Sequence, residues 1–324
     1  MYSAANDKDV LAIKQTLYRV SSSSPVVQAL EKAVQNGKQV TVLMEVKARF
    51  DEANNILMAR RLEKAGAHVI YGLVGLKTHS KCTLVIRREK DGIRRYVHVA
   101  TGNYNASTAK LYTDLGILTC SDRFGIDASA FFNLLSGYSD PPIWDSFIVA
   151  PINLRQRCIE LIDREIHFAK NGEDAHMIAK MNSLLDKGII EKLYEASQAG
   201  VKIELIVRGI CVLIPGIPGV SDNITVRSIV GRFLEHSRIF WFRNGGREEL
   251  YVSSADWMPR NLNDRVELMV PIEDPEIKRR LKQMVDIELS DNQKAHIMQA
   301  DGTWLKYYFR GESVMCTGSI FTSK

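Results

Sequence analysis

Apolar and polar positions alternate along this chain in two periods, which predict strands and helices in turn. Apolar, β-branched runs predict strands at residues 40–46 and 68–73, and amphipathic stretches predict helices at residues 25–35 and 51–64. Strands that alternate with helices of 10–15 residues are typical of a sheet with helices on its faces. The pattern therefore predicts an α/β fold.

Further elements follow from the same pattern. Residues 10–20, 80–87 and 95–100 are predicted strands, and a turn at Asp91-Gly92 joins the last two. A long helix is predicted at residues 154–170, where Asn171-Gly172 ends it.

The least regular stretch of the chain covers residues 136–151 and contains Gly137, Pro141, Pro142 and Pro151. Glycine and proline gathered in this way mark a junction between domains. A length of 324 residues also fits two domains of roughly 150 residues. We therefore predict one domain at residues 1–145 and a second at residues 146–324.

The order of features in the first half recurs in the second. A helix that ends at a glycine leads into a strand in both halves, and His79-Ser80-Lys81 and His236-Ser237-Arg238 each precede an apolar strand. The two histidines lie 157 residues apart, at 79 and 236. We interpret the chain as one α/β unit duplicated, with two related domains facing each other across a cleft.

Composition excludes several classes of protein. The chain is 45% hydrophobic, has 21 Gly and 9 Pro, and carries 43 Lys+Arg against 38 Asp+Glu, a net charge of +5. Disordered and collagen-like chains are excluded, and apolar runs fall short of the ~20 residues of a membrane span. Five scattered cysteines without a C-x-x-C pair indicate neither disulfides nor a zinc knuckle. The first residues show no secretory pattern, which predicts a cytoplasmic location.

The two H-x-K/R motifs are the main candidates for chemistry. Residues two apart on a strand share a face, so the side chains of His79 and Lys81 are predicted to project together. A histidine can accept a phosphoryl group as phosphohistidine, and a neighbouring cation stabilises phosphate oxygens. His236 and Arg238 offer the same geometry with a guanidinium. A single pair of this kind is more often a polar strand end, but its recurrence in a repeat favours a site.

Arginines at predicted strand ends are the second group of candidates. Arg19, Arg49 and Arg208 each lie at or just beyond the end of a predicted strand, where α/β folds place anionic ligands. Three such ends predict a basic pocket, which Tyr112 could face. The chain has no GxxxxGK[ST] or GxGxxG motif, so a P-loop and a Rossmann fingerprint are absent.

H-x-K and H-x-R on two α/β repeats resemble the phospholipase D superfamily, although Ile86 and Arg243 stand where that family's aspartates are expected. Longer strings resemble bacterial polyphosphate kinase of the first type, and the resemblance covers the C-terminal half of that family. The strings begin at Ala48-Arg49-Phe50, Gly75-Leu76-Lys77, Thr101-Gly102-Asn103, Val207-Arg208-Gly209, Ser221-Asp222-Asn223 and Ser253-Ser254-Ala255.

The resemblance implies roles for residues of this chain. His79 matches the phosphohistidine, and His236 matches a second histidine that binds nucleotide or transfers a proton. Tyr112 and Arg208 match ATP-binding positions. Arg19 and Arg49 match positions that the family associates with magnesium, although a guanidinium has no lone pair to give a metal, so we expect phosphate contacts there. Strand geometry adds Lys81 and Arg238 as phosphate ligands.

The implied reaction is reversible transfer of the terminal phosphate of ATP to inorganic polyphosphate through a phosphohistidine, with Mg²⁺ as cofactor. ATP or ADP and polyphosphate are the expected partners, nucleic acid is not, and the full-length protein is expected to be a homo-oligomer. Two alternatives stay open. One is a half that binds ATP and polyphosphate without turnover, and the other is a phospholipase D-type phosphodiesterase.

Overall fold

The computed structural model describes the chain except residues 22, 47, 49–51, 138–142 and 308–324. It divides into two compact units. Unit 1 comprises residues 1–110, 114–152 and 264–268, and unit 2 comprises residues 111–113, 153–263 and 269 onward. No helix among the described residues is long and apolar enough to span a membrane.

Unit 1 is built on a six-stranded sheet in the order β3-β2-β1-β5-β6-β8. Strands β1, β2 and β3 are parallel, and β5, β6 and β8 are antiparallel to their neighbours. The strands of this sheet are β1 (Val10–Leu17), β2 (Gln39–Met44), β3 (His68–Tyr71), β5 (Lys81–Glu89), β6 (Gly92–Ala100) and β8 (Gly116–Thr119). The other elements are α1 (Tyr2–Asn6), α2 (Pro25–Gln35), α3 (Glu52–Ala65), β4 (Lys77–Thr78), η1 (Thr108–Lys110), α4 (Asp122–Leu135) and β9 (Ile148–Ala150).

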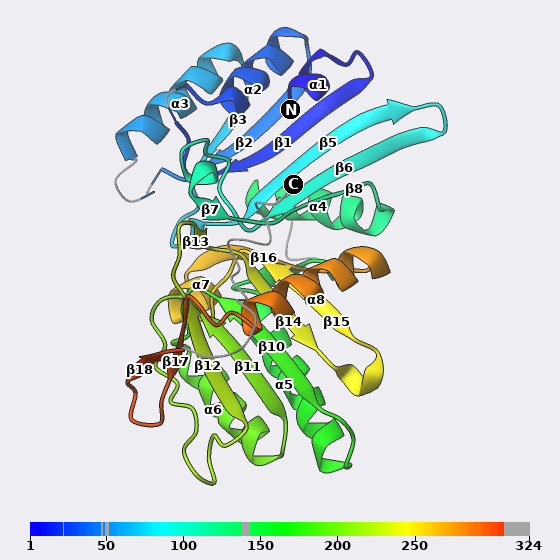
Figure 1. Cartoon of the computed structure of the whole chain (residues 1–324). Coiled ribbons are helices and arrows are strands. Elements are labelled where there is room, and N and C mark those ends of the chain that lie inside the picture. The colour runs from blue at the N-terminus through cyan, green and yellow to red at the C-terminus, as the bar shows by residue number, and fades with distance from the viewer. Residues whose placement is uncertain (22, 47, 49–51, 138–142, 308–324) are drawn as a thin grey trace. The chain divides into compact units, whose positions relative to one another are not determined.

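Helices cover the two faces of this sheet unequally. Apolar residues of β1 and β2 pack against α1, α2 and α3 in one core, which includes Ile13, Val42 and Leu30. The other face carries α4, and Figure 1 shows this helix on the opposite side of the sheet from α2 and α3. Ser24 caps α2 by accepting from the Val27 N–H, and Gly37, at φ +76°, follows the end of this helix.

Unit 2 contains a sheet in the order β18-β17-β12-β11-β10-β14-β15-β16. Its strands are β10 (His176–Met181), β11 (Lys202–Val207), β12 (Ile224–Ile229), β14 (Arg238–Phe242), β15 (Glu249–Ser253), β16 (Arg265–Pro271), β17 (Ala295–Met298) and β18 (Trp304–Lys306). The other elements are β7 (Tyr112–Thr113), α5 (Leu154–Lys170), α6 (Lys187–Gln198), β13 (Leu234–Glu235), η2 (Asn244–Gly246), α7 (Pro259–Asn263) and α8 (Pro275–Leu289).

The ladders of the two units confirm the predicted repeat. Each has two parallel strands beside an antiparallel hairpin, β5–β6 in unit 1 and β14–β15 in unit 2. Lys81 pairs with Ala100 at the start of the first hairpin, and Arg238 pairs with Ser253 at the start of the second. The H-x-K and H-x-R motifs therefore occupy equivalent places, immediately before equivalent strands.

The predicted elements agree with the structure except at some strand ends. Helices α2 and α5 have the bounds predicted for them. The strand predicted at residues 40–46 ends at Met44, and the strand predicted at residues 10–20 ends at Leu17. Glu45, the residue after β2, is buried and accepts a hydrogen bond from the Thr78 N–H, while its own N–H donates to the Leu17 carbonyl.

Candidate active site

The backbone before His79 is fixed by a segment that lies far away in the sequence. Strand β4 pairs in parallel with Arg265–Val266 at the start of β16, a part of the chain that belongs to unit 1. The N–H groups of His79 and Ser80 both donate to the Val266 carbonyl, at 3.0 and 2.9 Å. These bonds place the His79 side chain beside the next residue of β16, Glu267.

The imidazole of His79 is held by a buried carboxylate. Its Nδ1 lies 2.9 Å from both carboxylate oxygens of Glu267, whose side chain is fully buried, while His79 is 8% exposed. Burial lowers the pKa of His79 to about 3, and the Glu267 carboxylate only partly opposes this shift. The ring is therefore neutral at pH 7. A carboxylate at Nδ1 assigns the proton to that nitrogen, so Nε2 carries the lone pair.

Lys81, Tyr18 and Arg19 surround this histidine. Lys81 is 1% exposed, and its ammonium donates to the His79 carbonyl. The Tyr18 ring lies edge-on to the His79 ring with centroids 4.8 Å apart. The Lys81 ammonium and the Arg19 guanidinium lie 5.7 and 5.6 Å from the centroid of the same Tyr18 ring. Unit 1 thus gathers three sequence-predicted residues around Tyr18, while Arg49 lies outside the described residues.

In unit 2 the corresponding motif is built differently. The Arg238 guanidinium forms a two-pronged pair with Asp256, at 3.1 Å from Nε and from Nη2. Its Nη1 donates to the His236 carbonyl at 2.6 Å and lies 3.1 Å from His236 Nε2. Arg238 is 3% exposed, so this fork is already engaged with protein groups.

The other predicted residues of unit 2 join the same network. The Arg208 Nε donates to the Asn182 side-chain oxygen at 2.8 Å, and the Asn182 amide nitrogen donates to the His236 carbonyl at 3.0 Å. Burial lowers the pKa of Arg208, which nevertheless stays cationic at neutral pH. The rings of Tyr112 and His236 lie 4.9 Å apart. Four sequence-predicted residues of unit 2 are therefore brought together.

Strand β13 before His236 is held in the same way as β4 before His79. It pairs in parallel with β7, and the N–H groups of His236 and Ser237 donate to the Thr113 carbonyl. Lys180 and Glu288 are both nearly fully buried and form an ion pair. The Lys180 ammonium also bonds the carboxylate of Glu235 in β13, at 3.0 Å.

The positions that the resemblance places at the metal are unsuited to bind it directly. The described residues contain no group of three or more His, Cys, Asp or Glu side chains that could hold an ion. The positions predicted at the metal, Arg19 and Arg49, carry guanidinium groups without a lone pair to donate. Arg19 and Arg49 therefore do not fit the role of magnesium ligands.

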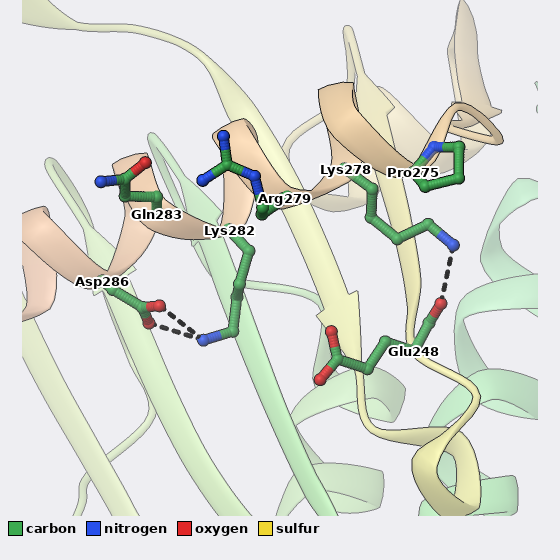
Figure 2. Close-up of a pocket in the computed structure, with 7 residues that line it drawn as sticks. All are labelled: Glu248, Pro275, Lys278, Arg279, Lys282, Gln283 and Asp286. Carbon is green, nitrogen blue, oxygen red and sulfur yellow. Dashed lines mark hydrogen bonds and ion pairs between the residues drawn. The ribbon is translucent and has the colours of Figure 1, made fainter.

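A hollow beside α8 is not a competing site. Figure 2 shows its lining, in which the Lys278 ammonium donates to the Glu248 carbonyl and Lys282 pairs with Asp286. The Lys282 ammonium also lies 4.8 Å from the centroid of the Trp241 ring. These cations have partners within the protein, and none of the predicted site residues lines the hollow.

Four residues of these sites were not predicted as site residues: Tyr18, Asn182, Glu267 and Asp256. Glu267 carries the clearest signal that could have found it, because it is a single acid in the apolar run Val266 to Val270. A buried carboxylate within such a strand requires a partner. Asp256 follows a strand end, a place where a solvated acid is equally common.

Comparison with solved structures defines the class of protein first. A phosphatidylserine synthase from Haemophilus influenzae matches with a TM-score of 0.58 over 96% of this chain and 86% of that chain, at 11% identity, which shows the fold alone. A polyphosphate kinase from Porphyromonas gingivalis matches with a TM-score of 0.92 and 39% identity over 98% of this chain and 49% of that chain. The predicted fold, two tandem α/β domains, is confirmed; the cleft between them stays a prediction.

Family models then identify the family. Residues 1–141 match polyphosphate kinase C-terminal domain 1, and residues 147–315 match polyphosphate kinase C-terminal domain 2. The chain belongs to the polyphosphate kinase family.

Curated relatives agree with this family. The polyphosphate kinase of Halalkalibacterium halodurans is 59% identical over 96% of this chain and 44% of its own length. That of Thermosynechococcus vestitus is 58% identical over 93% of this chain and 41% of its own length. The chain thus spans less than half the length of these relatives.

Proposed function

We propose that this chain carries the phosphoryl-transfer site of a polyphosphate kinase. It transfers the terminal phosphate of ATP to inorganic polyphosphate, reversibly, through a phosphohistidine on His79. The observation that carries the proposal is the His79–Glu267 pair, in which a neutral ring presents Nε2 while the carboxylate at 2.9 Å fixes Nδ1–H.

The reaction proceeds in two displacements. In the first, a bond forms between His79 Nε2 and the γ-phosphorus of ATP while the bond to the bridging oxygen breaks, and ADP leaves. In the second, a terminal oxygen of polyphosphate attacks that phosphorus, and the N–P bond breaks to restore neutral His79. Positive charge develops on the ring as the N–P bond forms, and the buried Glu267 carboxylate stabilises it.

The surrounding residues take roles that their contacts support. Arg19, Arg49 and Lys81 are proposed to stabilise phosphate oxygens near His79, and Tyr112 and Arg208 to bind ATP. His236 is proposed as the second histidine, which contacts nucleotide or transfers a proton. Arg238 was predicted as a phosphate ligand, and its contacts with Asp256 and His236 support a positioning role.

Mg²⁺ is proposed as the cofactor, held by phosphate oxygens of the substrate. The guanidinium groups of Arg19 and Arg49 then contact the same phosphates and not the metal. The boundary at residues 145/146 is proposed on the support of family matches that end at 141 and resume at 147. The homo-oligomer, the cytoplasmic location and the absence of nucleic acid stay predictions.

The test is incorporation of ³²P from γ-labelled ATP with Mg²⁺. The label is expected to be stable in alkali and labile in acid, and to be lost in His79→Ala. His236→Ala is expected to stop polyphosphate synthesis without moving the label to a new residue. His167→Ala, which alters an exposed histidine on α5, serves as the control. An acid-stable label, or one that survives His79→Ala, contradicts the proposal.

The same experiment separates the two alternatives. Binding of ATP and polyphosphate without any label supports a half that binds but does not turn over. Cleavage of a phosphodiester substrate without label from ATP supports a phosphodiesterase.

A further inference from the structure

Three hydrogen-bond donors form a row across the sheet of unit 1. The ladders pair Lys14 of β1 with Thr41 of β2, and Thr41 with His68 of β3. Paired residues on adjacent strands share a face and lie about 4.8 Å apart. Lys14, Thr41 and His68 therefore line up on one face of the sheet, on the side of α4 and opposite the packed core.

This row lines a hollow of about 440 Å³ together with Lys38, Gln39, Asn133 and Ser136. Lys38 and Gln39 lie at the amino end of β2, and Asn133 and Ser136 lie at the end of α4. Every polar side chain of the lining can donate a hydrogen bond, and none is a carboxylate. The hollow is therefore suited to an anion.

Lys14 is the main cation of this hollow. It is half-buried, and its ammonium contacts the Asn133 side-chain oxygen at 3.2 Å. Burial lowers the pKa of Lys14, and no carboxylate contributes to that shift. Lys38, which also lines the hollow, is 8% exposed, and its ammonium is already engaged with the carbonyls of Asp7 and Val10.

The end of α4 does not oppose an anion with free carbonyl groups. The Ser136 N–H and hydroxyl both donate to the Phe132 carbonyl, and the Ser136 N–H also donates to the Asn133 carbonyl. The Gly137 N–H donates to the Leu134 carbonyl. Carbonyl oxygens of the last turn are thus engaged within the helix end, and the Asn133 amide remains able to donate.

The equivalent row of unit 2 is of a different kind. Counting from the equivalent hairpins, the ladders place Ile178 where unit 1 has Lys14, and then pair Ile178 with Glu204 and Glu204 with Thr225. Glu204 already accepts from His176 at 2.7 Å and pairs with Lys202 at 3.1 Å. The basic row is therefore a property of unit 1 and not a requirement of the repeated fold.

We propose that the row Lys14–Thr41–His68 binds an inorganic phosphoryl anion, either free phosphate or a segment of polyphosphate. The site is separate from that of His79, because the row lies toward the amino ends of β2 and β3 while His79 lies beyond their carboxyl ends. The proposal rests on the proposed function only for the identity of the anion, and the site itself is inferred from the lining of the hollow. Binding at Lys14 is measured without turnover, so its failure is distinguishable from failure of the kinase reaction.

The test is the rate of acetylation of Lys14 by an N-hydroxysuccinimide ester, followed residue by residue by mass spectrometry. Tripolyphosphate at about ten times its Kd is expected to slow the reaction at Lys14 about tenfold, because an occupied site shields the amine. Lys187, exposed on α6, is the internal control and should react at an unchanged rate. Equal protection by orthophosphate assigns the site to free phosphate, and protection by tripolyphosphate alone assigns it to the chain.

Variants test the rest of the row. The double variant Thr41→Val, His68→Gln should weaken the protection of Lys14 by tripolyphosphate several-fold, while Lys32→Gln, on the exposed side of α2, should leave it unchanged. Unchanged reactivity of Lys14 at saturating tripolyphosphate overturns the proposal. Equal protection by sulfate at matched ionic strength also overturns it, because general screening then accounts for the effect.

Discussion

The two histidine sites share a sequence motif and a backbone arrangement, but they differ in the group that the buried carboxylate contacts. In unit 1 the Glu267 carboxylate bonds the imidazole of His79, and Lys81 bonds the backbone carbonyl of that histidine. In unit 2 the Asp256 carboxylate bonds Arg238, whose guanidinium then lies 3.1 Å from the ring of His236. One duplicated frame thus holds one ring oriented by an anion and one ring beside a cation.

The difference teaches how a duplicated unit can divide roles. A neutral ring with its Nδ1 proton held by a carboxylate is suited to accept a phosphoryl group. A ring beside a guanidinium is suited to contact the anionic phosphates of a nucleotide. Four predictions test this contrast, in order of decreasing magnitude.

The carboxylate of Glu267 should be the strongest determinant of labelling at His79. Glu267→Gln keeps the shape of the side chain but removes the charge that stabilises the ring as the N–P bond forms. We expect the rate of ³²P labelling from ATP to fall roughly 10²–10³-fold, the range of a preorganised charge contact. Single-turnover labelling measures this rate. Glu191→Gln, an exposed acid on α6, is the control, and an unchanged rate in a folded Glu267→Gln protein contradicts the role.

The fork between Asp256 and Arg238 should contribute more to stability than to labelling. Asp256→Asn removes one charge of a buried pair, and hydrogen bonds to charged groups contribute about 1.5–3 kcal/mol each. We expect a loss of that order in the free energy of unfolding by urea, with a smaller effect on the label at His79 than in Glu267→Gln. A greater loss of label in Asp256→Asn reverses the proposed division of roles.

The chain contains a matched control for this fork. Arg279 and Glu276 form the same two-pronged geometry on the exposed side of α8, at 2.9 and 2.6 Å. Solvent screens an exposed pair, so Glu276→Gln should change stability too little to resolve. If both variants lose stability equally, burial does not account for the contribution of the Asp256–Arg238 pair to the free energy of unfolding.

Much of this arrangement could be predicted from sequence because its signals are local. Periodicity located α2 and α5 with their observed bounds, and the recurrence of H-x-K and H-x-R located both histidines. The fold class followed from the alternation of the elements. Each element and each motif depends on the spacing of residues that are close together in the sequence, and this spacing determines which side chains share a face.

The carboxylates could not be predicted in the same way. Glu267 lies 188 residues from His79 in the sequence and reaches it only through the pairing of β4 with β16. A two-residue strand carries no periodic signal that would specify its partner. The strand predicted at residues 40–46 also ends earlier than its local pattern indicates, at Met44.

Arginine geometry at the ends of strands gives the third prediction. Lysine keeps the charge but loses the planar fork that holds two phosphate oxygens. Arg208→Lys and Arg49→Lys are each expected to cost at least ~1.4 kcal/mol of transition-state stabilisation, a tenfold loss in rate. Polyphosphate synthesis measures this, in a full-length relative if this half shows no turnover. Arg88→Lys, on an exposed strand position, should cost almost nothing, and equal behaviour of all three variants contradicts the basic pocket.

The smallest expected effect concerns pH, and it isolates the environment of His79. The native pKa of about 3 lies below the ordinary value of 6.5, so the unfolded chain binds the proton more readily. Stability from this group is therefore complete above pH 6.5 and is lost as the pH falls toward 3. Between pH 7 and 6 the loss should be roughly 0.7 kcal/mol, and it depends almost entirely on the unfolded pKa, because the native ring stays neutral throughout this interval.

Urea unfolding at pH 7 and at pH 6 measures this loss of stability. His79→Gln should remove this part of the pH dependence, and Lys187→Gln should retain it. If His79→Gln shows the same loss as the unaltered chain, the ring is not held neutral by burial beside Glu267, and its contrast with His236 fails.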